Sequence, residues 1–279
     1  MIGVRRAFGP GLLAVLPVLA VLGLFAAAVI GMVQGALTGP RGLSFTYFQQ
    51  ILDRADYHEV FLRTVGMSLA VALAGTALAY PIAFLLWRLP RWRNRLLVLV
   101  ILPWLVSLVV RTYGWIVLLG PRGVINETLA WMGVVSSPLP LMFNDFGIFV
   151  GLTHVLMPFA VIAILSALLQ IDPRLEEASE SLGARSGATL RRVLLPLSAP
   201  GIFVGINITF LTCMGAVVTP ILLGGLRQKM AGTQIYQEIV YNFNLPKASS
   251  WALALLACSF AVLALLRFVE ARIMHRYRF

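Results

Sequence analysis

Charge and the residues of enzyme chemistry are scarce in this sequence. Only 12% of the 279 residues are Asp, Glu, Lys or Arg, and the chain has 3 histidines. The histidines, His58, His154 and His275, are scattered, so no apolar stretch holds the His, Asp and Glu cluster that catalysis would need. We therefore expect a non-catalytic protein that binds no metal and no cofactor of its own.

Lysine and cysteine are nearly absent. Lys229 and Lys247 are the two lysines, and neither follows a glycine. A phosphate-binding loop of the GxxxxGK[ST] type needs a Gly-Lys pair, so the chain does not bind ATP by that route. Cys213 and Cys258 both fall within apolar stretches, where a free thiol packs as a small hydrophobic side chain. They indicate neither a disulfide nor a metal framework.

Hydrophobic residues, in contrast, are abundant. They make up 59% of the chain, and its mean hydropathy is +0.89. These values are far from those of ordinary globular domains and indicate a polytopic membrane protein. The net charge of +11 could suggest nucleic acid, but the basic residues lie at the ends of apolar stretches rather than in a solvated domain. We expect a lipid bilayer around the chain and no nucleic-acid partner.

Six apolar stretches are long enough to cross a bilayer core of about 30 Å, which takes roughly 20 helical residues. Their approximate ranges are 11–37, 62–87, 95–119, 146–169, 199–224 and 248–270. Helices are expected because hydrocarbon leaves no other way to satisfy backbone polar groups. We predict an all-α fold in which residues 1–279 form a single domain with six transmembrane helices. The first stretch is too long for a signal-peptide core, so we expect a retained anchor.

The basic residues predict an orientation, because positively charged loops stay in the cytoplasm. With both termini inside, fourteen fall on the cytoplasmic side: Arg5, Arg6, Arg88, Arg91, Arg93, Arg95, Arg174, Arg185, Arg191, Arg192, Arg267, Arg272, Arg276 and Arg278. Seven fall on the other side: Arg41, Arg54, Arg63, Arg122, Arg227, Lys229 and Lys247. The connection at 170–198 is therefore predicted to be cytoplasmic.

That connection has the pattern of two short helices with a hinge. Asp172-Pro173 is typical of a helix start, and Gly183 can adopt the left-handed conformation that ends a helix. Ser186 could begin a second short helix, with Pro196 and Pro200 bracketing the turn into the fifth stretch. From periodicity alone, an amphipathic loop whose basic residues face lipid head groups is an equally good interpretation.

The same connection resembles the signature loop of ABC-importer permeases, E-A-A-x3-G-x9-I-x-L-P. It reads Glu177-Ala178-Ser179, then Gly183, then Val193-x-Leu195-Pro196, with every spacing kept. Serine replaces the second alanine and valine replaces isoleucine. The resemblance implies a type I, MetI-like permease fold and coupling helices that sit in a groove of a separate ATPase subunit. The residues expected to couple to that ATPase are Glu176, Glu177, Ala178, Ser179, Gly183, Leu195 and Pro196.

The resemblance also implies partners and a location. The partners would be a second homologous permease subunit, two ATPase subunits that hold ATP and Mg²⁺, and an extracytoplasmic substrate-binding protein. The location would be the bacterial cytoplasmic (inner) membrane. A secondary transporter would instead need intramembrane ionisable relays or an inverted repeat. Arg111 is the one basic residue well inside a predicted span, away from its ends, and no repeat is evident.

Further stretches resemble the spermidine/putrescine branch of these permeases. They are Leu102-Pro103-Trp104, Val110-Arg111-Thr112-Tyr113-Gly114-Trp115 and Val218-Thr219-Pro220-Ile221-Leu222-Leu223-Gly224-Gly225. The resemblance implies import of a small organic cation such as a polyamine. Permeases for an opine, an amino-acid derivative or a phosphonate remain alternatives. The predicted spans hold no acid well inside them, so carboxylates for a polycation would have to come from a partner.

Six residues are candidates for the substrate pathway: Trp104, Arg111, Tyr113, Asn207, Thr212 and Thr219. Each has an alternative role. The two aromatics are typical of packing or of a membrane-interface belt, and the amide and hydroxyls are typical of hydrogen bonds between helices. Arg111 could bond carbonyls at a helix break near Pro103 or Gly114, or it could gate the substrate. The spacings Gly201-x3-Gly205, Gly147-x3-Gly151 and Gly31-x3-Gly35 predict close helix packing.

Overall fold

The computed structural model describes residues 10–39, 42–225 and 227–275. Apart from one short hairpin, the regular elements in these residues are helical, and six are long and apolar enough to cross a membrane. The prediction of an all-α fold with six membrane-crossing helices is confirmed. Arg5, Arg6, Arg41, Arg276 and Arg278, which the orientation argument counts, lie outside the described residues.

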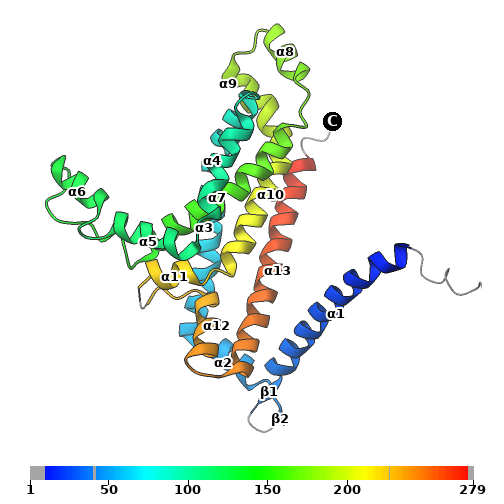
Figure 1. Cartoon of the computed structure of the whole chain (residues 1–279), viewed down its shortest axis with the longest axis vertical. Coiled ribbons are helices and arrows are strands. Elements are labelled where there is room, and N and C mark those ends of the chain that lie inside the picture. The colour runs from blue at the N-terminus through cyan, green and yellow to red at the C-terminus, as the bar shows by residue number, and fades with distance from the viewer. Residues whose placement is uncertain (1–9, 40–41, 226, 276–279) are drawn as a thin grey trace, which may run out of the picture. The chain divides into compact units, whose positions relative to one another are not determined.

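The chain divides into two compact units, which are described separately. The first comprises residues up to 54 together with 235–254. It contains α1 (Pro10–Ala36), β1 (Thr38–Gly39), β2 (Gly42–Leu43), α2 (Thr46–Asp53), the end of α12 (Ala231–Val240) and the start of α13 (Leu245–His275) (Figure 1). The strands pair antiparallel, with Thr38 opposite Leu43.

Within the first unit, polar contacts join segments far apart in sequence. The Ser250 hydroxyl donates to the carbonyl of Ala36 at 3.1 Å. The Glu238 carboxylate is only 2% exposed, and it accepts from Lys247 Nζ at 2.8 Å and from Asn242 Nδ2 at 2.8 Å. A buried carboxylate requires such a charged partner together with hydrogen bonds. These bonds fix the chain reversal between α12 and α13.

The second unit holds most of the remaining helices. They are α3 (Ala55–Arg88), α4 (Arg93–Leu105), α5 (Leu108–Leu119), α6 (Val124–Trp131), α7 (Asp145–Leu168), α8 (Arg174–Ser181), α9 (Ser186–Thr189), the π-helical turn η1 (Leu190–Leu194), α10 (Leu195–Met214) and α11 (Val218–Leu223). Its centre is formed by α3, α7 and α10, which pack closely along their lengths. The short helices α6 and α12 lie in connections between the predicted spans.

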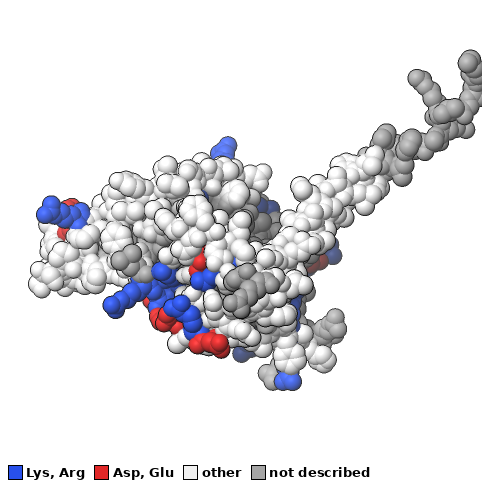
Figure 2. Space-filling model, turned by 90° about the horizontal axis from the view of Figure 1, so that it is seen from below, with Lys and Arg blue, Asp and Glu red and all other residues white. Residues whose placement is uncertain are grey.

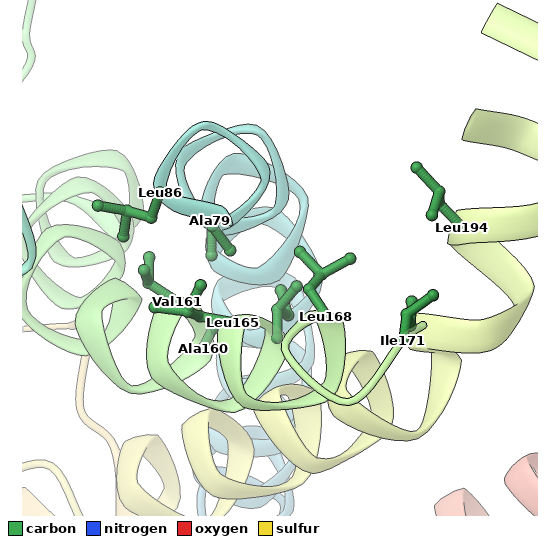
Figure 3. Close-up of a cluster of buried hydrophobic side chains, with 10 residues drawn as sticks. Ala79, Leu86, Ala160, Val161, Leu165, Leu168, Ile171 and Leu194 are labelled. Carbon is green, nitrogen blue, oxygen red and sulfur yellow. The ribbon is translucent and has the colours of Figure 1, made fainter. Parts of the chain in front are cut away.

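The α3/α7/α10 core is built from small and branched apolar side chains (Figure 3). Ala79 and Leu86 of α3 lie against Ala160, Val161, Leu165 and Leu168 of α7, and the cluster extends to Ile171 and Leu194. Small residues bring the helices close, since a Cβ on Gly201 of α10 would lie 2.5 Å from the Ala167 Cβ. A Cβ on Gly205 would lie 3.2 Å from Ala160. These two glycines confirm the packing that their spacing predicted.

One predicted span, 95–119, is interrupted. It consists of α4 and α5, separated by Val106 and Ser107, whose ψ angles of 142° and 134° are extended. The Arg111 side chain donates to the carbonyl of Val106 at 3.2 Å, replacing a bond that a continuous helix would have made through its backbone. The prediction of a single helix here was wrong, because a side chain satisfies the break.

The predicted span 199–224 is interrupted as well. Helix α10 ends at Met214 and α11 begins at Val218, with Pro220 in its first turn. Proline has no N–H and its ring crowds the carbonyl four residues earlier, so Pro220 favours a break in the helix before it. The chain instead restarts a short helix in which the proline is tolerated.

The turn predicted around Pro196 and Pro200 is absent. Helix continues from Ser186 to Met214 through α9, η1 and α10. At the junction the Leu195 N–H donates to the carbonyl of Leu190, five residues back, which is the wider spacing of a π-helical turn. Pro196 follows this wider turn directly, at the second position of α10. The wider turn lets a proline enter without ending the helix.

Candidate functional site

The signature-like segment forms α8, a hinge and α9, beyond the ends of α7 and α10 (Figure 1). Asp172 Oδ1 accepts from the Arg174 N–H at 2.9 Å, which satisfies a donor at the start of α8. Glu176 and Glu177 lie in the first turn, where the helix dipole favours negative charge. The helix start predicted at Asp172-Pro173 is confirmed.

Gly183 ends α8 with a φ of +81°. The carbonyls of the last turn are satisfied across it, since the Gly183 N–H donates to Glu180 at 2.9 Å and the Ala184 N–H to Ser179 at 3.1 Å. A residue with a Cβ is disfavoured in this left-handed conformation. The left-handed, helix-ending conformation predicted for Gly183 is therefore confirmed.

The two short helices are fastened to each other by hydroxyls. Ser179 Oγ and Thr189 Oγ1 lie 2.9 Å apart, and Thr189 is 1% exposed. Helix α8 packs mainly against α9 and η1. Ser179 thus faces inward and ties α8 to α9. Thr189 was not among the predicted site residues, because a threonine in a short polar segment has no sequence signal that marks its partner.

Glu176 also faces inward. Its carboxylate receives both terminal nitrogens of Arg88, with Nη1 at 3.1 Å from Oε2 and Nη2 in contact with Oε1. The Glu176 side chain is 13% exposed and that of Arg88 42%. The Arg88 guanidinium also lies 5.2 Å from the ring centres of both Phe84 and Trp87. Sequence analysis missed Arg88, whose only signal is its place in a short basic connection.

Glu177, Ala178 and Glu180 of α8 are exposed, as are Leu182 and Gly183 just after it, and we call these five residues the α8 outer face. Leu182 is 88% exposed. The acidic groups together with this leucine give a surface that could dock into a partner through both charge and apolar contact.

The second half of the motif has a different place. Leu195 and Pro196 belong to α10, and their neighbour Leu194 is 1% exposed in the core cluster. Leu195 itself is 43% exposed. The structure therefore separates the seven predicted coupling residues into an outward group, an inward group and two residues that begin a core helix.

Three of the predicted pathway residues lie on α4 and α5. Trp104 packs edge-on against Phe159, with ring centres 5.6 Å apart, and Tyr113 is 63% exposed. Arg111 bonds the Val106 carbonyl, while its Nε and Nη1 are buried with no hydrogen-bond partner among the described residues. The bond at the helix break favours the structural interpretation of Arg111.

The other three lie on α10 and α11. Asn207 is 6% exposed, and its amide atoms have no hydrogen-bond partner among the described residues. Thr212 is exposed and donates to the Ile208 carbonyl of its own helix at 2.8 Å. Thr219 is 3% exposed, and its methyl would lie 2.9 Å from a Cβ on Gly151. In the part of the chain that the structure describes, none of the six pathway candidates lines the hollows reported below.

A charged patch occupies another part of the second unit, and Figure 2 shows side chains of both signs gathered on one face. It surrounds a hollow of about 260 Å³ lined by Asp56, Glu59, Val60, Arg63, Arg227 and Lys229. Arg63 bonds Glu59 at 2.9 Å and the Arg227 carbonyl at 2.7 Å, and it lies 3.8 Å from Asp145. An adjoining hollow of about 480 Å³ continues between α3 and α7 as far as Phe149.

A groove between α7 and α10 is lined mostly by apolar side chains. Its volume is about 380 Å³, and Phe159, Ser166, Gln170 and Val204 are among its lining residues. Within residues 10–39, 42–225 and 227–275, no group of three His, Cys, Asp or Glu side chains is placed to hold a metal ion.

Comparison with known proteins identifies the family. A family model described as "Binding-protein-dependent transport system inner membrane component" matches residues 75–275. The chain belongs to this family. This permease is thus a multi-pass transport component of an inner membrane, and the assignment made from the loop motif is confirmed. Transporters of this family work with an ATPase and a periplasmic binding protein.

Curated relatives of the permease include the "Spermidine/putrescine transport system permease protein PotB" of Haemophilus influenzae. It is 34% identical over 217 residues, which are 77% of this chain and 74% of the relative. PotB of Escherichia coli K12 is 34% identical over 209 residues, 75% of this chain and 76% of that one. A "Probable molybdenum ABC transporter permease protein" of Haloferax volcanii is 31% identical over 185 residues, 66% of this chain and 64% of the relative.

Solved structures share the permease's fold. A chain of a bacterial alginate ABC transporter, in complex with an alginate-bound periplasmic protein, has a TM-score of 0.77 at 19% identity and covers 94% of this chain and 93% of its own. A chain of the MetNI methionine ABC transporter in an inward-facing conformation has a TM-score of 0.54 at 21% identity, with 81% and 100% covered. At these identities the likeness concerns the fold alone.

Proposed function

We propose that this permease translocates a polyamine such as spermidine or putrescine, delivered by an extracytoplasmic binding protein. The observation that carries the proposal is its 34% identity to PotB permeases over three quarters of both chains. The Trp104, Arg111 and Thr219 segments resemble that same branch. Carboxylates near an aromatic ring are suitable for organic cations, and the patch that contains Glu59 and Asp145 adjoins Phe149.

The working complex proposed here contains a second homologous permease and two ATPase subunits, which hold ATP and Mg²⁺. The α8 outer face docks into a groove of the ATPase through Glu177, Ala178 and Gly183. The exposure of these three residues, on a short helix and at the left-handed glycine that ends it, supports this role. Glu176, Ser179, Leu195 and Pro196 support the docking element from behind, since they bond or begin helices within the chain.

A different small solute is the competing proposal. A relative named for molybdenum transport is 31% identical to this chain, so identity at this level does not separate substrates. The acids of the charged patch are also partly neutralised by Arg63. An opine, an amino-acid derivative or a phosphonate would therefore use the same fold and the same ATPase docking.

The test begins with the cognate binding protein, titrated by calorimetry with spermidine, putrescine, an opine and a phosphonate. We expect micromolar or tighter binding of a polyamine and roughly hundred-fold weaker binding of the others, about 2.7 kcal/mol. Uptake of labelled spermidine by cells that express the complete transporter should depend on this permease. Retention of an anionic solute in place of polyamines would refute the substrate assignment.

Docking is tested in the same cells with Glu177→Ala. Because the substitution removes an outward charge from α8, we expect uptake and binding-protein-stimulated ATP hydrolysis to fall by roughly ten-fold. The permease should still reach the membrane. Glu270→Ala is the matched control, since Glu270 pairs only within α13, with Arg267 at 3.2 Å, among the described contacts. Equal activities in the two variants would contradict docking through the α8 outer face.

A further inference from the structure

The Arg88–Glu176 contact joins two elements that are distant in the chain. Arg88 is the last residue of α3, a membrane-crossing helix of the core, and Glu176 lies in the first turn of α8. Both terminal nitrogens of the guanidinium meet both carboxylate oxygens. This two-point geometry restricts rotation as well as distance, because the planar fork of arginine matches the carboxylate plane.

The surroundings of the pair confine both of its side chains. The Phe84 and Trp87 rings, each 5.2 Å away, flank the Arg88 guanidinium, and Glu176 is largely shielded from solvent. Because Glu176 is shielded, water and salt screen this ion pair less than they would screen a pair of mobile, fully exposed side chains.

The end of α3 that carries Arg88 is itself rigid. Arg93, at the start of α4, donates from Nε to the Leu86 carbonyl at 3.2 Å and from Nη2 to the Trp87 carbonyl at 3.3 Å. These bonds satisfy carbonyls that a helix end leaves free. Leu86 is 1% exposed in the core beside α7. A force applied to Arg88 therefore reaches the packed helix instead of unwinding its last turn.

Two other ion pairs among the described residues of the second unit do not have this character, and Arg63 of α3 and Asp145 of α7 lie 3.8 Å apart, beyond hydrogen-bonding distance. Arg63–Glu59 and Arg267–Glu270 each join residues three or four apart on a single helix. Such pairs move as one body with their helix and transmit nothing between elements. Arg88–Glu176 instead spans the gap between the segment that α8 occupies and the transmembrane core, in addition to the covalent connections at each end of the loop.

We propose that the Arg88–Glu176 pair transmits the displacement of α8 to α3 during transport. The inference rests on the proposed docking of α8 to the ATPase and deepens it, by assigning opposite tasks to adjacent glutamates. Glu177 receives the push at the partner's surface, and Glu176 passes it to the core. Arg88 and Glu176 are positioning residues, because they act through the helices that they join and not on the substrate.

The experiment uses the purified complete transporter in proteoliposomes, with Arg88→Ala, Glu176→Ala and the exchanged pair Arg88→Glu/Glu176→Arg. Each single variant should reduce the stimulation of ATP hydrolysis by the loaded binding protein about five-fold or more, within the usual range of coupling between sites. The ATPase should co-purify at wild-type levels. The exchanged pair should recover at least half of the lost stimulation, which a role in packing alone would not produce.

Arg267→Ala is the control, because it removes an ion pair that lies within α13 and joins no two elements. It should leave stimulated hydrolysis unchanged. Three results would overturn the proposal: wild-type stimulation in both single variants, no recovery in the exchanged pair, or loss of ATPase co-purification in the single variants, which would make the pair a docking contact.

A comparison with Glu177→Ala separates this inference from the docking proposal. If Glu177→Ala lowers stimulation while the Arg88 and Glu176 variants do not, docking stands and the transmission link fails. If Glu177→Ala has no effect while the Arg88 and Glu176 variants lower stimulation and the exchange recovers it, transmission stands and the ATPase contacts α8 elsewhere. The readout is ATP hydrolysis per complex, so the identity of the solute does not enter the comparison.

Discussion

At the scale of single residues, two adjacent glutamates of α8 have opposite environments. Glu176 is largely buried against Arg88, whereas Glu177 is exposed. On a helix, neighbours lie about 100° apart, so one can face the protein while the next faces a partner. The motif spacing marks both positions as part of a docking loop, and only the contact with α3 distinguishes their tasks.

Gly183 offers a sharp test at the same scale. Because its φ is +81°, Gly183→Ala should strain the end of α8 by about 1–2 kcal/mol, although a Cβ there would meet nothing within 4 Å. We expect binding-protein-stimulated ATP hydrolysis to fall several-fold while the thermal unfolding temperature of the permease falls by only about 2–4 °C per kcal/mol of strain. Differential scanning fluorimetry and the proteoliposome assay measure the two effects.

Gly187→Ala is the matched control. Gly187 belongs to α9, its φ is not in the positive range, and a Cβ there also meets nothing within 4 Å. Alanine is favoured over glycine within a helix by roughly 0.5–1 kcal/mol, so this variant should be as active as the wild type. A loss of stimulation equal to that of Gly183→Ala would show that left-handed geometry is not the cause.

At the scale of elements, α7 and α10 pack closely because glycines on α10 have no side chain at the contact. A Cβ on Gly201 would lie 2.7 Å from the Ala163 carbonyl oxygen as well as against Ala167. The Ala163 carbonyl belongs to the backbone, so it cannot move aside for a new Cβ as the end of a flexible side chain could. Gly201→Ala should separate the two helices and lower stability by about 1–3 kcal/mol, measured as unfolding of the permease in detergent micelles.

Gly66→Ala provides the control for that change. Gly66 lies in α3, a long helix of the same core, but a Cβ there would meet nothing within 4 Å. It should be neutral or slightly stabilising, because alanine costs less conformational entropy than glycine. If Gly201→Ala were equally well tolerated, the close approach of α7 and α10 would not limit stability.

At the scale of the whole molecule, the proposed orientation has both termini and the α8 outer face in the cytoplasm. The test uses single cysteines at Glu180 and at Thr128, both exposed, in a chain whose Cys213 and Cys258 are replaced by alanine. We expect a membrane-impermeant maleimide to label Thr128→Cys in intact cells, and Glu180→Cys only after permeabilisation. The reverse pattern would invert the topology.

The sequence by itself determined the class of molecule and the location of its loop. Hydropathy demands helices in a bilayer, because unpaired backbone groups are too costly in hydrocarbon. A spaced motif with Gly183 at its hinge identified the family, which the match to residues 75–275 confirms. The glycine pair at 201 and 205 also predicted close packing, since small residues favour it directly.

Tertiary structure decided the rest, because the deciding contacts lie far apart in the chain. The breaks after α4 and α10 depend on Arg111 reaching a carbonyl and on Pro220 restarting a helix, and neither interrupts the hydropathy. The direction in which Glu176 points depends on Arg88, 88 residues away. Periodicity describes a single element, whereas the partner of a side chain is fixed only when other elements pack against it.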